Sequence, residues 1–330
     1  MGRTLEEMIA DWRDVYKNLL LCKDRPHMKH NYSNFALIKV VLGTPGLIIS
    51  ESRWLFYSLA DECTLETLEY VFSRVPPSSR AMHHAITQNN PLMIKFLLQY
   101  SDLQPNLEDI FGLVSSPDSL CSLKILLADP RYAKVDKYEL FITAICSEST
   151  EVALYLLPEV DPAAQNNKAI VVAASTGDTE IVRALLCSQT VNPSVRDNCA
   201  LKSAIVDGYA EVVELLLSHP RTLLPDITDL REAFGTAIKH NHSEVVRVLL
   251  ADGRLDPSTY SFSNVCKKGS LEMFRVLYSD KRADWSVDRN AALRVARKLR
   301  RTEIVTLLLQ DERVSAQEQK MTRRRAVLGY

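Results

Sequence analysis

The chain has 330 residues, of which 46% are hydrophobic and 25% are charged, and its formal net charge is −1. This composition is typical of a folded protein, and the small net charge gives no general attraction to nucleic acid or to a membrane surface. Only ten glycines are present, which disfavours folds that depend on many tight turns or on glycine-rich phosphate loops.

Residues 1–30 are predicted to form an N-terminal amphipathic helix that acts as a cap. Between Thr4 and Leu20 the apolar residues fall on one side of a helix, and Thr4 and Glu7 have the spacing of a capping box. We favour a helix that packs on the rest of the chain over one that docks into a partner. Residues 31–52 are interpreted as a degenerate half repeat that ends near Pro45.

The N-terminus carries no recognisable targeting signal. It is charged throughout, and Glu6 stands where N-myristoylation requires Ser or Thr. No apolar run approaches the roughly 18–20 residues that span a bilayer. The seven cysteines are odd in number and never spaced C-x-x-C. We therefore expect a reducing compartment, the cytoplasm or alternatively the nucleus, and no membrane partner.

Residues 53–314 contain nine copies of one pattern, 26 to 33 residues apart. Each copy has an apolar residue three positions before an anchor, and a pair of large apolar residues twelve and thirteen positions after it. This phase is kept over more than two hundred residues, so the pattern defines a repeat array. The anchors are Leu59, Ala85, Val114, Ala144, Ala173, Ala204, Ala237, Val265 and Ala296.

Each copy is predicted to form two short helices joined by a turn. The turn carries Gly, as at Gly177 and Gly208, or a residue that tolerates turns, and Glu opens the second helix in seven copies. An acid at that place complements the helix dipole by about 0.3–1 kcal/mol. An arginine recurs after the second helix, for which we favour a capping role over ligand binding: Arg131, Arg221, Arg254, Arg282 and Arg313.

The stretch CALKSAIVDGYAEVVELLLSHPR, residues 199–221, resembles the ankyrin repeat. The loop pieces VNPSVRDNCAL and GRLDPSTYS are similar to a divergent branch of that family. No copy contains T-P-L-H, and most spacings fall short of the family's usual length, which implies short loops. The resemblance implies an all-α, ankyrin-type α-solenoid of about nine helix–turn–helix repeats with short hairpin-like loops.

The C-terminal end is basic. Residues 291–330 contain ten Lys and Arg against four Asp and Glu, and residues 315–330 are interpreted as a basic C-terminal tail. A nuclear signal or a nucleic-acid contact would explain this charge. A solvated cap with a disordered tail explains it equally simply, and we favour that interpretation.

The sequence shows no motif for catalysis or cofactor binding. Phosphate-loop, dinucleotide, nucleophile-elbow and H-E-x-x-H patterns are all missing. Cys22, His27 and His30 are spaced loosely like zinc ligands, but no second pair follows. We therefore expect neither an enzyme nor a cofactor or metal.

The family resemblance implies a protein partner bound on the concave face, formed by the loop tips and the exposed side of the first helices. We thus expect a non-catalytic scaffold or adaptor, and a monomer. The alternative is a nuclear or nucleic-acid-associated regulatory factor that uses the basic C-terminus, although nucleic acid is the less favoured partner. Mapping by repeat position gives these candidates: His83, His84, Lys202, Ser203, Arg196, Asp197, Asp229, Trp285, Asp288, Arg289 and Arg294.

Overall fold

The computed structural model describes residues 64–103, 106–116, 118–222, 227–259, 262–268 and 270–328. Throughout these ranges the regular structure is helical, and none of these residues lies in a strand. The chain divides into two compact units, residues 1–136 and 137–330, which are described separately below.

The described part of unit 1 contains two complete helix pairs and part of a third. Helix α5 packs against its partner α6 and against the next first helix, α7, while α6 packs against α8. The helices are α4 (Leu65–Phe72), α5 (Ser79–Thr87), α6 (Pro91–Leu97), α7 (Leu107–Val114) and α8 (Leu120–Leu127), followed by a 3₁₀ turn at Pro130–Tyr132.

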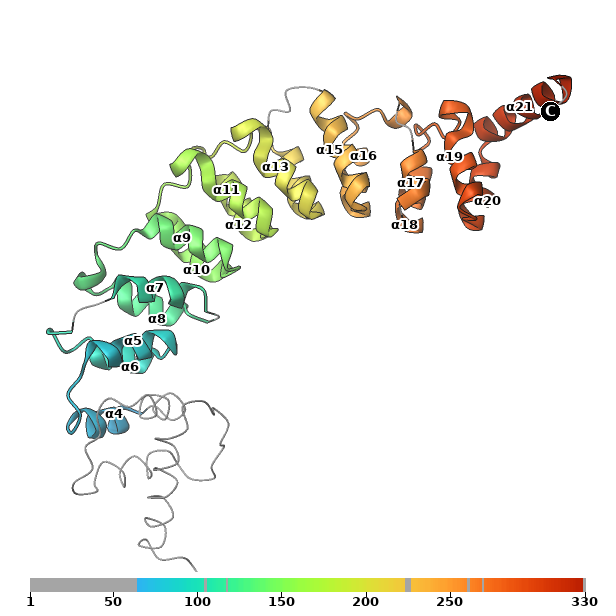
Figure 1. Cartoon of the computed structure of the whole chain (residues 1–330). Coiled ribbons are helices and arrows are strands. Elements are labelled where there is room, and N and C mark those ends of the chain that lie inside the picture. The colour runs from blue at the N-terminus through green and yellow to red at the C-terminus, as the bar shows by residue number, and fades with distance from the viewer. Residues whose placement is uncertain are drawn as a thin grey trace, which may run out of the picture. The chain divides into compact units, whose positions relative to one another are not determined.

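Within its described residues, unit 2 contains six helix pairs and one further helix. First helices pack on first helices, as α9, α11 and α13 do in succession, and second helices pack on second helices, as α10, α12, α14 and α16 do (Figure 1). The first helices are α9 (Lys137–Cys146), α11 (Ala164–Thr176), α13 (Val195–Asp207), α15 (Ile227–His240), α17 (Ser263–Lys268) and α19 (Val287–Lys298). The others are α10 (Thr150–Leu156), α12 (Thr179–Cys187), α14 (Ala210–Ser218), α16 (Ser243–Ala251), α18 (Leu271–Ser279), α20 (Thr302–Gln310) and α21 (Glu312–Leu328).

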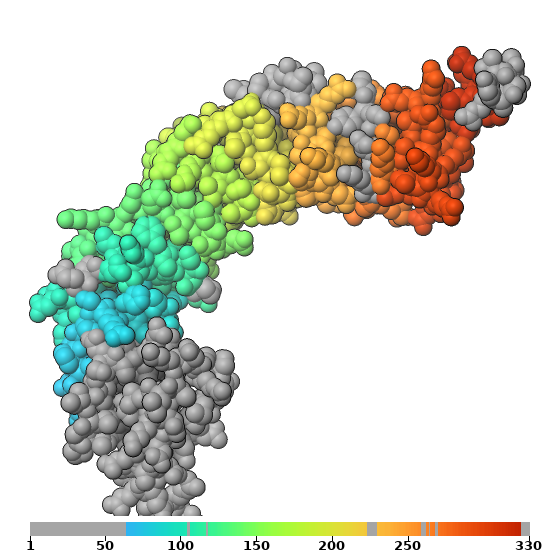
Figure 2. Space-filling model, viewed as in Figure 1, coloured from blue at the N-terminus to red at the C-terminus, as the bar shows by residue number. Residues whose placement is uncertain are grey.

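The small anchors lie where the helices of neighbouring repeats meet. All eight anchors in the described ranges belong to first helices and are at most 1% exposed, whereas Leu59 lies outside those ranges. A methyl group at this place lets adjacent helices approach closely and still fill the space between them. Figure 2 shows side chains closing the gaps that the ribbon leaves between repeats.

The paired apolar residues of the second helices divide into two roles. The first member is buried in each described repeat, as Leu126, Leu185 and Leu216 show. The second member is less enclosed, and Leu309 in the last repeat is 41% exposed. The burial pattern of α7 differs from that of the other first helices. Phe111, three positions before the anchor Val114, is only partly buried, whereas its neighbour Ile110 is fully buried.

The turns within the repeats have the predicted backbone conformation. Gly177 and Gly208 have φ of 78° and 88°, and Asn89, Asp118 and Asn241 also adopt positive φ. Asn and Asp tolerate this left-handed region better than other side chains do. The predicted Glu stands in the first turn of each second helix that carries it, as the helix dipole favours.

The basic C-terminal segment is largely helical rather than an extended tail. Helix α21 covers Glu312–Leu328 and packs against α19 and α20. It is fixed by Val314, which is fully buried, and by an ion pair of 2.5 Å between Arg297 and Glu318. The expected N-terminal helix and half repeat lie outside the described residues.

Candidate partner-binding surface

The first residues of α11, α13 and α19 form an unusual left-handed turn at the tip of each preceding loop. In each, three successive residues adopt φ between 52° and 58°, and none of them is glycine. A non-glycine residue in this conformation costs about 1–2 kcal/mol, so the surrounding structure has to hold it. The three triplets are Gln165–Asn166–Asn167, Arg196–Asp197–Asn198 and Asp288–Arg289–Asn290.

An asparagine closes each triplet and ties it to the protein interior. The side-chain oxygen of Asn167 accepts a hydrogen bond of 2.7 Å from the backbone N–H of Asn192 in the next repeat. Asn290 is fully buried, and its amide donates to the carbonyl of Val314 at 2.9 Å. Asn198 is 2% exposed at the matching place, but its buried amide forms no hydrogen bond with a described residue. Asn167 and Asn290 therefore fix their loop tips against the following repeat.

The other two residues of each triplet are exposed, and some of them contact neighbouring residues. Arg196 donates to the carbonyl of Gln165 in the preceding loop at 3.2 Å, and Lys202 on α13 pairs with Asp197 at 2.5 Å. Arg294 on α19 donates to the carbonyl of Asp288 at 3.3 Å. The predicted loop-tip and first-helix residues therefore do meet, in α13 and again in α19, as exposed charges held in a defined position.

A second set of contacts joins successive repeats on their other side. Five arginines that follow second helices direct their guanidinium groups to backbone carbonyl oxygens of the preceding repeat. The acceptor is usually the second member of the paired apolar residues, as in Arg282 to Leu250 at 2.8 Å and Arg254 to Leu217 at 3.2 Å. The five inter-repeat arginines are Arg131, Arg221, Arg254, Arg282 and Arg313.

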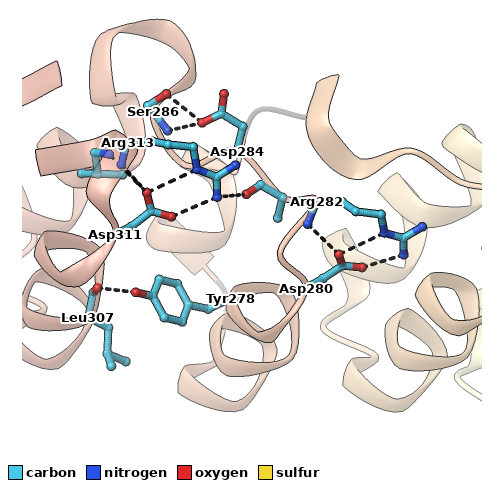
Figure 3. Close-up of polar contacts among 10 residues, drawn as sticks. Tyr278, Asp280, Arg282, Asp284, Ser286, Leu307, Asp311 and Arg313 are labelled. Carbon is cyan, nitrogen blue, oxygen red and sulfur yellow. Dashed lines mark hydrogen bonds and ion pairs between the residues drawn. The ribbon is translucent and has the colours of Figure 1, made fainter. Parts of the chain in front are cut away.

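Most inter-repeat arginines are oriented by an aspartate two positions earlier. Asp280 and Asp311 each hold their arginine through both carboxylate oxygens, as the close-up shows (Figure 3). The hydrogen bond from Arg282 lowers the pKa of the Asp280 carboxyl, and the one from Arg131 does the same at Asp129. The arginines do act on helix ends, but the prediction had the wrong helix: the carbonyl groups that they reach lie at or after the end of the second helix of the preceding repeat, not of the helix that each arginine follows.

The comparison with known families agrees with this architecture. A family model of ankyrin repeats, in three copies, matches residues 140–229 and 173–261. Residues 140–261 are therefore ankyrin repeats. A comparison with curated protein sequences gives no match. Ankyrin repeats are protein–protein interaction modules, so the exposed surface of the repeats is where binding residues are to be sought.

Two of the predicted binding residues are buried in the repeat array. Trp285 is 2% exposed and packs at ring-centroid distances of 4.7 Å on both Phe262 and Phe274, so its interpretation as an exposed anchor is wrong. His84 is 9% exposed, in contrast to its expected place on the outer side of a first helix. Trp285 fills space between two repeats, a role that its repeat position did not predict.

The remaining candidates differ in their environment. His83 is exposed, and its Nδ1 lies 2.8 Å from the largely buried carboxylate of Asp109 on α7. Ser203 is half-buried beside Lys202 on α13. Arg289 is exposed in its loop tip. Asp229 belongs to the first turn of α15, and its side chain lies outside the described residues.

The described residues show no constellation that would support catalysis. None of their His, Cys, Asp and Glu side chains form a group of three able to hold a metal ion, and the loosely zinc-like residues Cys22, His27 and His30 lie outside the described ranges. Burial raises the pKa of the Cys266 thiol to about 12, which makes it a poor nucleophile. Among the described helices, none is long and apolar enough to cross a membrane.

Proposed function

We propose that this repeat protein is a non-catalytic scaffold or adaptor that binds a partner protein on its loop–helix face. By this face we mean the triplet tips and the adjacent first helices in the described part of unit 2. Its residues are Gln165, Arg196, Asp197, Lys202, Ser203, Asp288, Arg289 and Arg294.

The ordered left-handed tips are the observation that carries this proposal. Charged side chains on flexible loops lose conformational freedom when a partner binds, and that loss opposes association. Here Asn167 and Asn290 fix the tips from inside, and the Lys202–Asp197 pair holds two of the charges. A surface prepared in this way can bind a partner with a smaller loss of conformational entropy, which suits recognition.

The proposal includes a monomer that acts in a reducing compartment, the cytoplasm or alternatively the nucleus. Cys121, Cys146 and Cys187 are exposed as free thiols, and such side chains persist where disulfides do not form.

Affinity capture from the source cell tests the proposal. The intact chain should recover one or more proteins that an Arg196→Glu/Lys202→Glu variant fails to recover, because reversing two held charges on the face opposes the same partner. The matched control is Arg183→Glu, which changes an equally exposed charge on the second helix α12. Recovery of the same proteins by all three chains would overturn the proposal.

A further inference from the structure

The turns between first and second helices form a continuous edge in unit 2, separate from the loop tips. The imidazole Nε2 of His242 lies 2.8 Å from the carbonyl oxygen of Val206 in the preceding repeat. The Arg301 guanidinium likewise donates to the carbonyl of Lys267 at 3.0 Å. Side chains of one turn therefore rest on the last turn of the preceding first helix, and this turn edge is a single surface across several repeats.

The charge of the turn edge changes sign along unit 2. In the turns of α11/α12 and α13/α14 the charged residues are acidic: Asp178, Glu180, Asp207 and Glu211. In the turns of α17/α18 and α19/α20 cations prevail, and the exposed or half-exposed ones are Lys267, Lys298, Arg300 and Arg301. These four residues are named the basic edge. Like charges so close together repel one another, so they destabilise the free protein slightly.

Three cations of the basic edge are not neutralised within the described part of the chain. Lys267, Lys298 and Arg300 form no ion pair with any described residue, in contrast to Arg282 and Arg313, which are held by aspartates. Arg301 differs from them, because its guanidinium contacts the backbone of Lys267. The positive charge of Lys267, Lys298 and Arg300 is consequently available to an external group.

The position of Arg300 suits a variant that removes its charge. Arg300 adopts φ of 56° at the turn position where Gly177 and Gly208 stand in earlier repeats. Glu148 has φ of 57° at the same place in its own repeat, so this conformation alone does not mark a function. A glycine would adopt it without the strain of about 1–2 kcal/mol that a side chain brings, and the arginine adds a positive charge to the edge.

An exposed leucine lies within the basic edge. Leu299 stands between Lys298 and Arg300 in the chain and is 47% exposed. An apolar side chain surrounded by cations favours a ligand that combines negative charge with an apolar group.

We infer that the basic edge binds an acidic segment of a partner protein that also carries an apolar side chain. The inference rests on the proposed scaffold function and adds a second surface and the charge of the partner. A phosphodiester chain carries closely and uniformly spaced charge. It would meet the exposed carboxylates of Glu272 and Glu303, which stand in the first turns of α18 and α20 beside the cations. Separate carboxylates on a peptide can avoid those acids, and a leucine of the peptide can cover Leu299.

A fluorescence-anisotropy titration tests the inference with the full chain. The probe is a fluorescein-labelled peptide of Asp and Glu residues with one central Leu, and the comparison peptide has Asn and Gln in place of the acids. The acidic peptide should bind, and its affinity should fall as salt is raised from about 50 to about 200 mM because the contact is electrostatic.

The decisive variant is Lys298→Glu/Arg300→Gly. Glycine at position 300 suits the left-handed turn, so folding should be retained while two cations are removed. Binding of the acidic peptide should weaken about tenfold, which corresponds to about 1.4 kcal/mol. The control Arg275→Glu, an exposed charge on the second helix α18, should bind the peptide like the unaltered chain.

Three results would overturn the inference. In the first, the intact chain fails to bind the acidic peptide. In the second, the double variant binds the peptide as tightly as the intact chain does. In the third, the intact chain binds an equally charged oligothymidylate or duplex DNA more tightly than the peptide, and the double variant no longer binds that nucleic acid. The last result would assign the basic edge to nucleic acid. If the peptide fails but captured proteins still depend on Arg196 and Lys202, the inference is wrong and the proposed scaffold function stands.

Discussion

The guanidinium of Arg221 reaches four backbone carbonyl oxygens of the preceding repeat. It donates to Gln189 and Ser188 at 2.6 Å, to Val191 at 3.0 Å and to Leu186 at 3.2 Å. These acceptors lie at and just after the end of α12, where helix carbonyls lack partners within the helix. One side chain therefore closes the end of a helix and joins two repeats at once.

Replacing this arginine should destabilise the array. Arg221→Ala should lower the free energy of unfolding by about 1–3 kcal/mol, since hydrogen bonds from a charged donor are lost and several carbonyls are left unpaired. Urea denaturation followed by circular dichroism measures the change. Arg183→Ala, which removes an exposed arginine on α12, should change stability by less than about 0.5 kcal/mol. Equal effects of the two variants would contradict the capping role.

His219 takes the place that aspartate has before four of the five inter-repeat arginines. Its Nδ1 accepts a hydrogen bond from the backbone N–H of Arg221 at 3.3 Å, as the aspartates do in their own turns. Burial and, to a smaller extent, the charge of Arg221 lower the pKa of His219. The folded chain therefore resists protonation of this ring, and stability falls as the pH drops through about 6.5, the ordinary histidine value.

His219→Asp should stabilise the protein and remove this acid sensitivity. A carboxylate can bind the Arg221 side chain as Asp280 binds Arg282, which is worth about 0.5–1 kcal/mol at a partly exposed site. The advantage should grow as the pH is lowered from 7 towards 5, because the contribution of a carboxyl with a lowered pKa is lost only at more acid pH. Thermal unfolding across this range measures it. The same gain in an Arg221→Ala background would show that the arginine is not involved.

At the scale of single elements, the turn at Gly208 combines two requirements. Its φ of 88° is a conformation that side chains rarely adopt. A Cβ at this place would also lie 2.5 Å from Nδ1 of the His242 ring, which covers the turn from the next repeat. Gly253, after α16, has φ of 77° but no atom within 4 Å of such a Cβ.

Comparing the two glycines therefore separates two costs of adding a side chain: the strain of the left-handed backbone, which both share, and the clash with a neighbouring ring, which only Gly208 has. Gly253→Ala should destabilise by about 1 kcal/mol through the left-handed backbone alone. Gly208→Ala should cost about 1–3 kcal/mol more, because the His242 ring has to move. Chemical denaturation of both variants, and of Gly208→Ala combined with His242→Ala, measures the difference. Equal losses for the two single variants would mean that the ring yields freely.

The features that depend only on residue type and on spacing along the chain were predictable from the sequence. The helix pairs, the buried anchors such as Ala204, and the turn glycines follow from spacing and residue type. Trp285 and His84 were not, because their burial depends on which neighbouring side chains leave space beside them. The helix α21 was also missed, since its basic composition resembles that of a solvated tail, and only the burial of Val314 fixes it.

The candidate surface was predictable in its location but not in its geometry. Repeat position placed Arg196, Asp197 and Lys202 on one face, as found. The left-handed triplets depend on a side chain reaching another repeat, as Asn167 reaches Asn192. Such a contact between positions far apart in the chain leaves no periodic signal in a single sequence.

At the scale of the whole molecule, an ankyrin array gains stability mainly from contacts between adjacent repeats. In unit 2 an inter-repeat arginine joins α13/α14, α15/α16, α17/α18 and α19/α20 to the preceding pair. The α11/α12 pair has Thr190 at the corresponding place, so its junction with α9/α10 lacks this contact. We therefore expect unit 2 to unfold locally first at the junction between α9/α10 and α11/α12, where this arginine contact is missing.

The missing contact can be installed. Ser188 has φ of −74° and ψ of 134°, near the −81° and 109° of Asp280, and its hydroxyl accepts from the backbone N–H of Thr190 as the aspartates do. In Ser188→Asp/Thr190→Arg the new guanidinium should reach the carbonyl of Leu157, the second apolar residue of the preceding pair. We expect the free energy of unfolding to rise by about 1 kcal/mol, and hydrogen exchange in α10 to slow.

The single variants supply the control for this change. Thr190→Arg lacks the carboxylate that orients the side chain, and Ser188→Asp lacks the cation, so each alone should have little effect. A double-mutant cycle isolates the coupling between the two positions. If the double variant gains no more free energy of unfolding than the two single variants gain together, the carboxylate does not act by orienting the arginine.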